Sequence, residues 1–147
     1  MEAFLTQEDL IISLITLLVV ATCVVIHLEV LTATRRHIVH ISGTRPRMIL
    51  LVSAILLAHL IEICVFGLGY YFSGFLTGDS VLIGYDSYHL KDYFYYSASV
   101  YSTLGFGDLV PTGGLRIMTG IESMTGLVLI TWSASFTFLE MQRRWED

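Results

Sequence analysis

Residues 99–111, with the sequence SVYSTLGFGDLVP, place two glycines one residue apart in an otherwise hydrophobic chain. Glycine adopts backbone conformations closed to other residues, so Gly105 and Gly107 allow consecutive carbonyl groups to point in one direction. A row of aligned carbonyl oxygens can replace the hydration shell of a cation. Thr103 would add its carbonyl and hydroxyl at the inner end of this row, and Asp108 would concentrate cations at the outer mouth. The segment therefore predicts a cation-binding loop.

The residues around the glycines are expected to hold this loop in place. The ring of Phe106 would pack outward against the preceding helix, and Tyr95 or Tyr96 would donate a hydrogen bond to Asp108 behind the loop. Residues 90–102 read as a short helix, whose negative dipole end would point at the cation path. Its candidate N-caps are Asp86 and Ser87, with Asp92 in the first turns. Side chains are therefore the scaffold, and the backbone is the binding surface.

Composition indicates a membrane protein. The chain has 147 residues, of which 54% are hydrophobic and only 14% charged, with a mean hydropathy of +0.71. A net charge of −5 and the lack of a long Lys/Arg run argue against nucleic acid as a partner. Cys23 and Cys64 lie in apolar runs at no metal-ligand spacing, which favours buried free thiols.

The fold class predicted from these runs is an all-α membrane protein with three transmembrane helices and a re-entrant pore helix between the second and third. Residues 1–33 form an additional N-terminal helix, which the acidic Glu2, Glu8 and Asp9 distinguish from a signal peptide. Residues 34–47 form a basic linker and residues 48–142 a pore module. The module divides into an outer helix (48–76), an external loop (77–89), a pore helix (90–102), a filter (103–108) and an inner helix (114–142).

The distribution of positive charge predicts the orientation. The cytoplasmic side should carry six of the eight Lys and Arg residues, namely Arg35, Arg36, Arg45, Arg47, Arg143 and Arg144. The N-terminus is then outside and the C-terminus in the cytoplasm, as for a multi-pass protein of the plasma (inner) membrane. The basic linker could also touch anionic lipid, although topology alone accounts for its charges.

The motif TLGFGD resembles the potassium-channel signature TxGxGD, and the order helix, pore helix, signature, helix resembles the minimal pore module of that family over roughly residues 48–142. The nearest resemblance is to bacterial ion-channel proteins related to two-pore-domain potassium channels. It implies that Thr103, Leu104, Gly105, Phe106 and Gly107 form a selectivity filter with Asp108 at its outer end. Most family members have valine or isoleucine at the position of Leu104, and many have glutamate at the position of Ser99.

The resemblance also implies a glycine hinge in the inner helix, at Gly126. The alternative is that Gly126 and Gly120 are small-residue contacts between spans. One helical face after Gly126 carries apolar candidates for the cavity lining: Leu127, Ile130, Ala134 and Phe138. Phe138 could form a hydrophobic constriction that gates by dewetting, although such a side chain more often faces lipid or core.

Three ionisable residues, His59, Glu62 and Glu122, lie inside predicted spans. One hypothesis is a pH sensor, and the other is a hydrogen-bonded polar cluster that orients the helices. A haem-binding or structural bundle is a remote alternative, with His27 and His59 as the candidate axial ligands.

The sequence thus predicts a potassium-selective channel rather than an enzyme. One loop supplies only one wall of a pore, so a homotetramer is expected. The first span has no repeated arginines, which argues against voltage sensing. We expect transported K⁺ ions but no organic cofactor. A poorly selective monovalent cation channel is the alternative, and a regulatory subunit is not identified.

Overall fold

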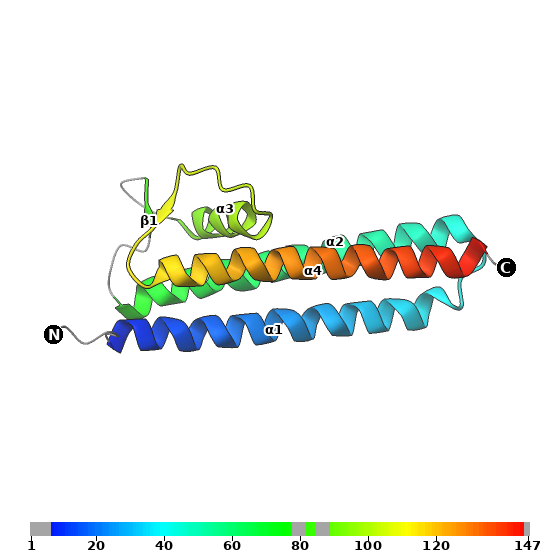
Figure 1. Ribbon diagram of the computed structural model, residues 1–147, viewed down its shortest axis with the longest axis horizontal. Coiled ribbons are helices and arrows are strands. Elements are labelled where there is room, and N and C mark those ends of the chain that lie inside the picture. The colour runs from blue at the N-terminus through cyan, green and yellow to red at the C-terminus, as the bar shows by residue number, and fades with distance from the viewer. Residues whose placement is uncertain (1–6, 78–81, 85–88, 146–147) are drawn as a thin grey trace.

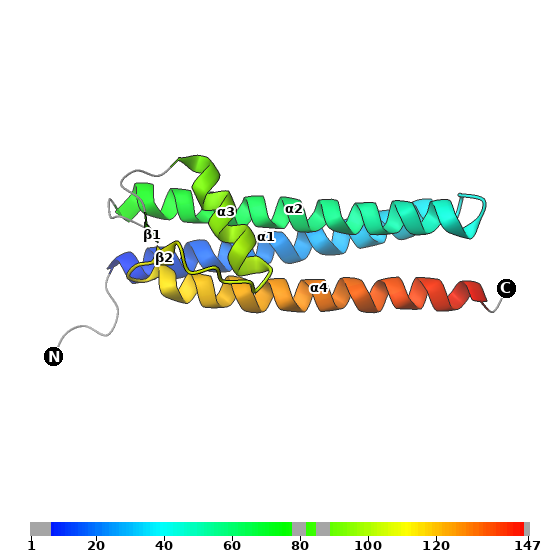
Figure 2. The same cartoon turned by 90° about the horizontal axis from the view of Figure 1, so that it is seen from above.

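The computed structural model describes residues 7–77, 82–84 and 89–145. Three long helices lie side by side along the molecule: α1 (Gln7–Ile38), α2 (Thr44–Thr77) and α4 (Leu115–Trp145). The short α3 (Leu90–Tyr101) crosses this bundle near the end at which α1 and α4 begin (Figures 1 and 2). In the described part of the chain, these three long helices are apolar enough to cross a membrane. The predicted class, an all-α membrane protein with three spans and a short intervening helix, is confirmed.

The connection between α1 and α2 is shorter than the predicted basic linker. α1 continues to Ile38 and α2 begins at Thr44, so most of residues 34–47 are helical. Arginine is a good helix former, and a proline such as Pro46 is tolerated in the first turn, where its missing N–H has no helical partner. Gly43, at φ +87°, makes the turn between the two helices.

α3 lies within one residue of its predicted range. At its start the Asp92 carboxylate accepts a hydrogen bond from the backbone N–H of His89 at 2.7 Å, so the first turn is capped from within the helix. The two residues expected as N-caps, Asp86 and Ser87, lie outside the described residues. α4 begins one residue later than predicted and continues to Trp145.

Two short strands were not expected. β1 (Leu82–Ile83) pairs antiparallel with β2 (Val110–Pro111), with Leu82 opposite Pro111 and Ile83 opposite Val110. Strands of two residues are too short to produce an alternating sequence pattern, which is why the sequence did not reveal them. The pairing ties the chain before α3 to the chain after the glycine loop.

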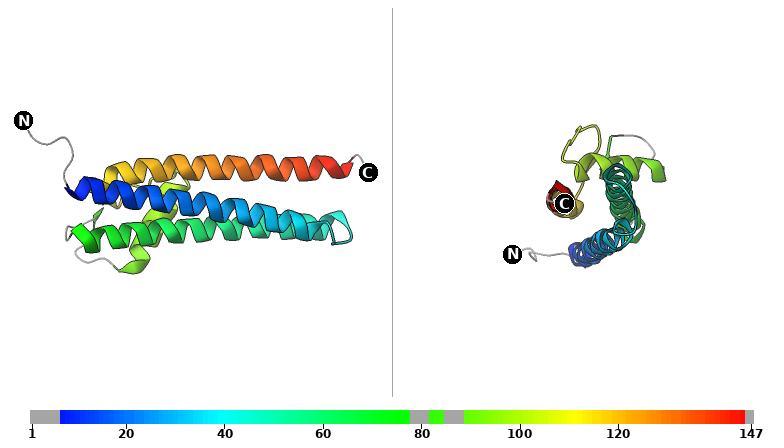
Figure 3. Two further views of the ribbon diagram at one scale, coloured as in Figure 1. Left: turned by 90° about the horizontal axis from the view of Figure 1, so that it is seen from below. Right: turned by 90° about the vertical axis from the view of Figure 1, so that its right-hand side faces the viewer.

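The core lies where α2 meets the other three helices. Figure 3 shows α3 and α1 on opposite sides of α2 when the molecule is viewed along its length. The fully buried large side chains at this crossing include Phe66 and Tyr70 from α2, Tyr101 from α3 and Met118 from α4. α3 is therefore packed into the bundle by aromatic side chains, and this fixes where the glycine loop begins.

Candidate functional site: the glycine loop and its supports

The backbone of residues 103–108, which we call the filter loop, alternates in handedness. Thr103, Gly105 and Gly107 have φ values of +60°, +57° and +80°, whereas the residues between them do not have positive φ. Alternation of left-handed and ordinary conformations turns successive carbonyl groups to the same side of the chain. This is the arrangement expected for a row of cation ligands.

The amide groups of the filter loop show to which side its carbonyl groups point. The N–H of Gly105 donates to the carbonyl oxygen of Ser99 at 3.1 Å, and the N–H of Phe106 donates to the Ser99 hydroxyl at 3.2 Å. In a planar trans peptide the preceding C=O points opposite to the N–H. The carbonyls of Leu104 and Gly105 therefore point away from α3, toward the open side of the loop.

Thr103 is in a conformation that a β-branched residue rarely adopts. A positive φ at such a residue costs of order 1–3 kcal/mol and persists only where the surroundings impose it. Its N–H donates to the carbonyl of Val100 at 2.9 Å, which extends the end of α3 directly into the loop. The strained residue is thus held at the junction between helix and filter loop.

The outer end of the loop is held by Tyr95. Its hydroxyl donates to Oδ2 of Asp108 at 2.8 Å, and its ring stacks on Phe106 with centroids 6.1 Å apart and planes within 5°. Tyr96, the other candidate donor, instead bonds Thr119 of α4 at 2.8 Å. Tyr95 therefore contacts the loop through both its ring and its hydroxyl.

β1 and β2 bring a second backbone against the loop's outer end. A Cβ atom added to Gly84 would lie 2.4 Å from the carbonyl oxygen of Asp108, so only glycine fits this approach. Gly84 also has φ +154°, which other residues rarely adopt. The chain before α3 therefore lies directly on the residue that ends the filter loop.

Two buried carboxylates hold α3 from behind. Ser97 and Tyr101, one helical turn apart on the same face, donate to Glu122 of α4 (2.5 Å) and to Glu62 of α2, respectively. Both glutamates are completely buried. Tyr101 precedes Thr103 by two residues, so Glu62 is coupled through it to the start of the filter loop.

The three ionisable residues expected to form one polar cluster divide into two groups. Glu122 also accepts from Tyr70 at 2.5 Å and does not bond the others. His59 and Glu62 lie together, with His59 Nδ1 3.0 Å from Glu62 Oε2. The second group, which we call the histidine network, has five members: His27, His59, Glu62, Tyr101 and Ser133.

The histidine network joins all four helices. His27 of α1 contacts Glu62 Oε1 through Nδ1 at 2.9 Å. The Ser133 hydroxyl of α4 lies between the two imidazoles, 3.2 Å from His27 Nε2 and 3.3 Å from His59 Nε2. Both nitrogens of both rings thus face a partner within the network.

This arrangement argues against haem or metal at these residues. His27, His59 and Glu62 could offer ligand atoms within 4.8 Å of one another. However, the Glu62 carboxylate and the Ser133 hydroxyl already occupy the positions that the ring nitrogens face. Neither ring presents a nitrogen to an unfilled position, as an axial haem ligand must. These side chains are hydrogen-bond partners of one another.

Gly126 is a point of close packing. α4 runs through it without a break, and an added Cβ would lie 2.2 Å from the Tyr101 carbonyl oxygen. The contact is with the end of α3 and not with another span, so it differs from the predicted small-residue contact, and the hinge at Gly126 stays a prediction. Gly120 has no atom within 4 Å of such a Cβ, so it makes no equivalent contact.

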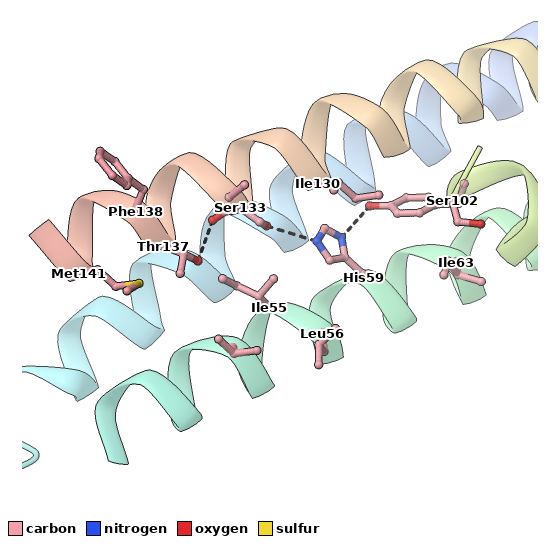
Figure 4. Close-up of a pocket in the computed structure, with 13 residues that line it drawn as sticks. Ile55, Leu56, His59, Ile63, Ser102, Ile130, Ser133, Thr137, Phe138 and Met141 are labelled. Carbon is pink, nitrogen blue, oxygen red and sulfur yellow. Dashed lines mark hydrogen bonds between the residues drawn. The ribbon is translucent and has the colours of Figure 1, made fainter. Parts of the chain in front are cut away.

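The apolar face of α4 beyond Gly126 is open in the single chain. The side chains of Leu127, Ile130 and Phe138 are 57%, 40% and 61% exposed, and Ala134 is also exposed. Ile130, Ala134 and Phe138 line a groove of about 670 Å³ between α4 and α2. Figure 4 shows this groove, with His59 and Ser133 at its inner wall and Phe138 at its rim.

The C-terminal ends of α1 and α4 are joined by an ion pair. Glu140, which is buried, lies 3.6 Å from Arg35 of α1 and 3.1 Å from Arg143 of its own helix. α1 is thus attached to α4 at this end and to α2 through His27. The helix that the sequence adds to the minimal module is an integral part of the bundle.

Sequence reasoning missed several of these residues. The sequence suggests His27 only as a haem ligand and assigns no role to Ser97, Tyr101 or Ser133. The spacing of Ser97 and Tyr101 by four residues was the one available signal, since it places two donors on one face of α3. The positive φ of Thr103 leaves no trace in the sequence.

Comparison with known proteins agrees with this geometry. A family model described as "Ion channel" matches residues 58–143, which contain the second half of α2, α3, the filter loop and nearly all of α4. An uncharacterized membrane protein of Bacillus subtilis (strain 168), YdjJ, is 47% identical over 47 residues, which are 31% of this chain. The chain covers 14% of the length of that relative. No solved structure matches the chain significantly.

Proposed function

The chain belongs to the ion-channel family, and we propose that it is a potassium-selective channel in which the filter loop binds dehydrated K⁺ through its carbonyl oxygens. The observation that carries this proposal is the alternation of positive φ at Thr103, Gly105 and Gly107. Together with the amide bonds to Ser99, it turns the carbonyls to one open side. The proposed activity is passive transport through the plasma membrane and not catalysis.

The open side of the loop supports a homotetramer. Leu104 and Phe106 are 64% and 62% exposed, and Cβ atoms built on Gly105 and Gly107 would meet nothing within 4 Å. Unsatisfied backbone at membrane depth is tolerated only where it is covered by protein or lines a water-filled path. Further copies of the chain around a common axis would cover the loop with protein and enclose a water-filled path. Potassium filters are rings of four such loops.

Gating by a voltage sensor is not part of the proposal. α1 has no arginine between Gln7 and Thr34, and its two arginines lie in its last turns. Voltage sensing requires repeated arginines at membrane depth. A background conductance is the function that fits, with the N-terminus outside and the basic α1–α2 connection in the cytoplasm.

Phe138 is the proposed gate residue. Its side chain is exposed on the same α4 face as Ile130 and Ala134 and is free to meet its copies around the axis of a tetramer. A ring of phenylalanines at the inner end of a pore would exclude water and stop conduction. The groove beside it gives the ring room to move aside.

Ion flux into liposomes tests the proposed function. Purified protein is reconstituted, and K⁺ uptake is compared with Na⁺ uptake under the same gradient. We expect K⁺ uptake well above Na⁺ uptake and loss of both in Gly105→Ala, because alanine is strained at φ +57°. Equal uptake of the two ions would favour the poorly selective cation channel, which the unusual Leu104 makes the second candidate.

A further inference from the structure

The hydrogens that the histidine network supplies can be counted against the contacts that need them. It contains five contacts that each need one hydrogen: Glu62 with His27, His59 and Tyr101, and Ser133 with the two imidazoles. A carboxylate supplies none, each hydroxyl supplies one, and each neutral imidazole supplies one. The neutral set therefore brings four hydrogens to five contacts. A sixth contact, 2.9 Å between His59 Nδ1 and the Tyr101 hydroxyl, needs no hydrogen of its own, because one Nδ1–H can be shared between the Tyr101 and Glu62 oxygens.

No choice of tautomers removes this deficit. If both imidazoles carry their hydrogen on Nδ1, as the Glu62 contacts require, then both Nε2 atoms are bare. Ser133 can donate to only one of them, and its oxygen lone pair faces the other. If either imidazole moves its hydrogen to Nε2, a bare Nδ1 faces a carboxylate oxygen instead. With Glu62 ionised and both imidazoles neutral, one contact of the five is repulsive in every arrangement.

One additional proton completes the network. We place this proton on an imidazole and not on Glu62, because imidazole is the stronger base. An imidazolium donates through both nitrogens, so every contact then has its hydrogen, and its charge cancels that of Glu62. Net neutrality matters because His27 and Glu62 are completely buried. A divalent metal in the same place would leave an excess positive charge beside a single carboxylate. The geometry therefore favours the proton.

We propose that the histidine network holds one imidazolium against the Glu62 carboxylate, and that loss of this proton weakens the support of the filter loop and lowers K⁺ conduction. The inference rests on the proposed function for its effect on conduction, but not for its proton count. The effect reaches the loop through Tyr101, which bonds Glu62, contacts Gly126 and precedes Thr103 by two residues. Loss of the proton breaks one of the two bonds from Ser133, which attach α4 to α1 and α2.

Among the described residues, Cys23 and Glu122 are the other titratable groups that act on this network. Cys23 of α1 lies against the backbone of Glu62, with Sγ 3.8 Å from its carbonyl oxygen. Glu122 of α4 is close enough for its charge to act on Tyr101 and on Cys23. The face of His27 is covered by Trp132, which carries no charge. Glu122 is therefore the group that the experiment must separate from Glu62.

Glu62→Gln makes the test sharp. A glutamine amide can donate to His27 and accept from His59 and Tyr101, and His27 Nε2–H can then donate to Ser133, which donates to His59. All five contacts are satisfied with both imidazoles neutral, and the added hydrogen cannot titrate. We therefore expect this variant to conduct, but without the pH dependence of the wild type.

The experiment measures K⁺ flux in liposomes from about pH 5 to about pH 9, which covers and extends beyond the range of about pH 5 to 8 in which an ordinary histidine changes its charge. The wild type should lose flux several-fold as pH rises, Glu62→Gln should give a flat profile, and the exposed-histidine control His37→Gln should follow the wild type. A flat wild-type profile overturns the proposal. So does a pH dependence that persists in Glu62→Gln but disappears in Glu122→Gln.

A second measurement does not depend on conduction. In ¹⁵N-histidine solid-state NMR of the protein in bilayers, one of His27 and His59 should be an imidazolium in the wild type, and neither in Glu62→Gln. Two neutral imidazoles in the conducting wild type, or stoichiometric zinc in protein purified without chelator, would overturn the proposal. A wild type that conducts at no pH while showing the imidazolium would refute the proposed function and leave the proton assignment intact.

Discussion

The backbone of Tyr101 and the Cα of Gly126 meet with no side chain between them, since a Cβ on Gly126 would lie 2.2 Å from the Tyr101 carbonyl oxygen. The end of α3 therefore rests directly on the middle of α4. Any movement of α4 at this point must move the residue that leads into the filter loop. The contact couples the helix proposed to carry the gate to the loop proposed to select the ion.

Gly126→Ala should therefore damage the filter loop. The methyl group collides with backbone, which cannot rotate away as a side chain could, and overpacking of this kind costs about 1–3 kcal/mol. Gly120→Ala on the same helix is the matched control, because its methyl group would meet nothing within 4 Å. Alanine in an open helical position stabilises by up to about 1 kcal/mol. Thermal unfolding in detergent should separate the two, and equal melting temperatures would contradict the contact.

Tyr95→Phe should shorten the lifetime of the conducting filter. The change keeps the ring that stacks on Phe106 and removes only the hydroxyl that donates to Asp108 at 2.8 Å. A hydrogen bond to a charged group contributes about 1.5–3 kcal/mol, with the lower end expected for a half-exposed pair. Single-channel open times should fall several-fold, whereas Tyr71→Phe, on the exposed side of α2, should not change them. Unchanged open times in Tyr95→Phe would show that Asp108 needs no such donor.

Ser99→Ala probes the support behind the loop. The variant loses the hydroxyl that accepts from the Phe106 N–H, but keeps the carbonyl that accepts from Gly105. The filter loop should keep the alignment of the Leu104 carbonyl, which the Gly105 N–H fixes, and lose that of the Gly105 carbonyl, which the Phe106 N–H fixes. We expect a reduced preference for K⁺ over Na⁺ with measurable current. Full selectivity in this variant would mean that the backbone bond alone holds the loop.

Phe138→Ala tests the proposed gate. Removing the ring should widen the constriction and raise the open probability in single-channel recordings. Leu139→Ala is the control, because Leu139 is similarly exposed but lies on a neighbouring face of α4 that does not line the groove. An open probability that stays the same in Phe138→Ala, or that rises equally in both variants, would reject a gate at this residue.

The sequence predicted the elements well because their signals are strong. Long apolar runs specify α1, α2 and α4, and the breakers Gly105 and Gly107 mark the end of α3. The histidine network could not be predicted, because His27 and Ser133 are 106 residues apart and are brought together only by packing. The role of Gly126 depends in the same way on a helix from another part of the chain. Local pattern specified the helices, and long-range packing specified the supports of the loop.

The bi-ionic reversal potential is the measurement that bears most directly on K⁺ selection by the filter loop. With K⁺ on one side of a bilayer and Na⁺ on the other, the filter geometry predicts a reversal potential strongly displaced toward the K⁺ equilibrium value. Gly107→Ala, strained at φ +80°, should abolish the current or the displacement. A wild-type current that reverses near zero would contradict selection of K⁺ by these carbonyls.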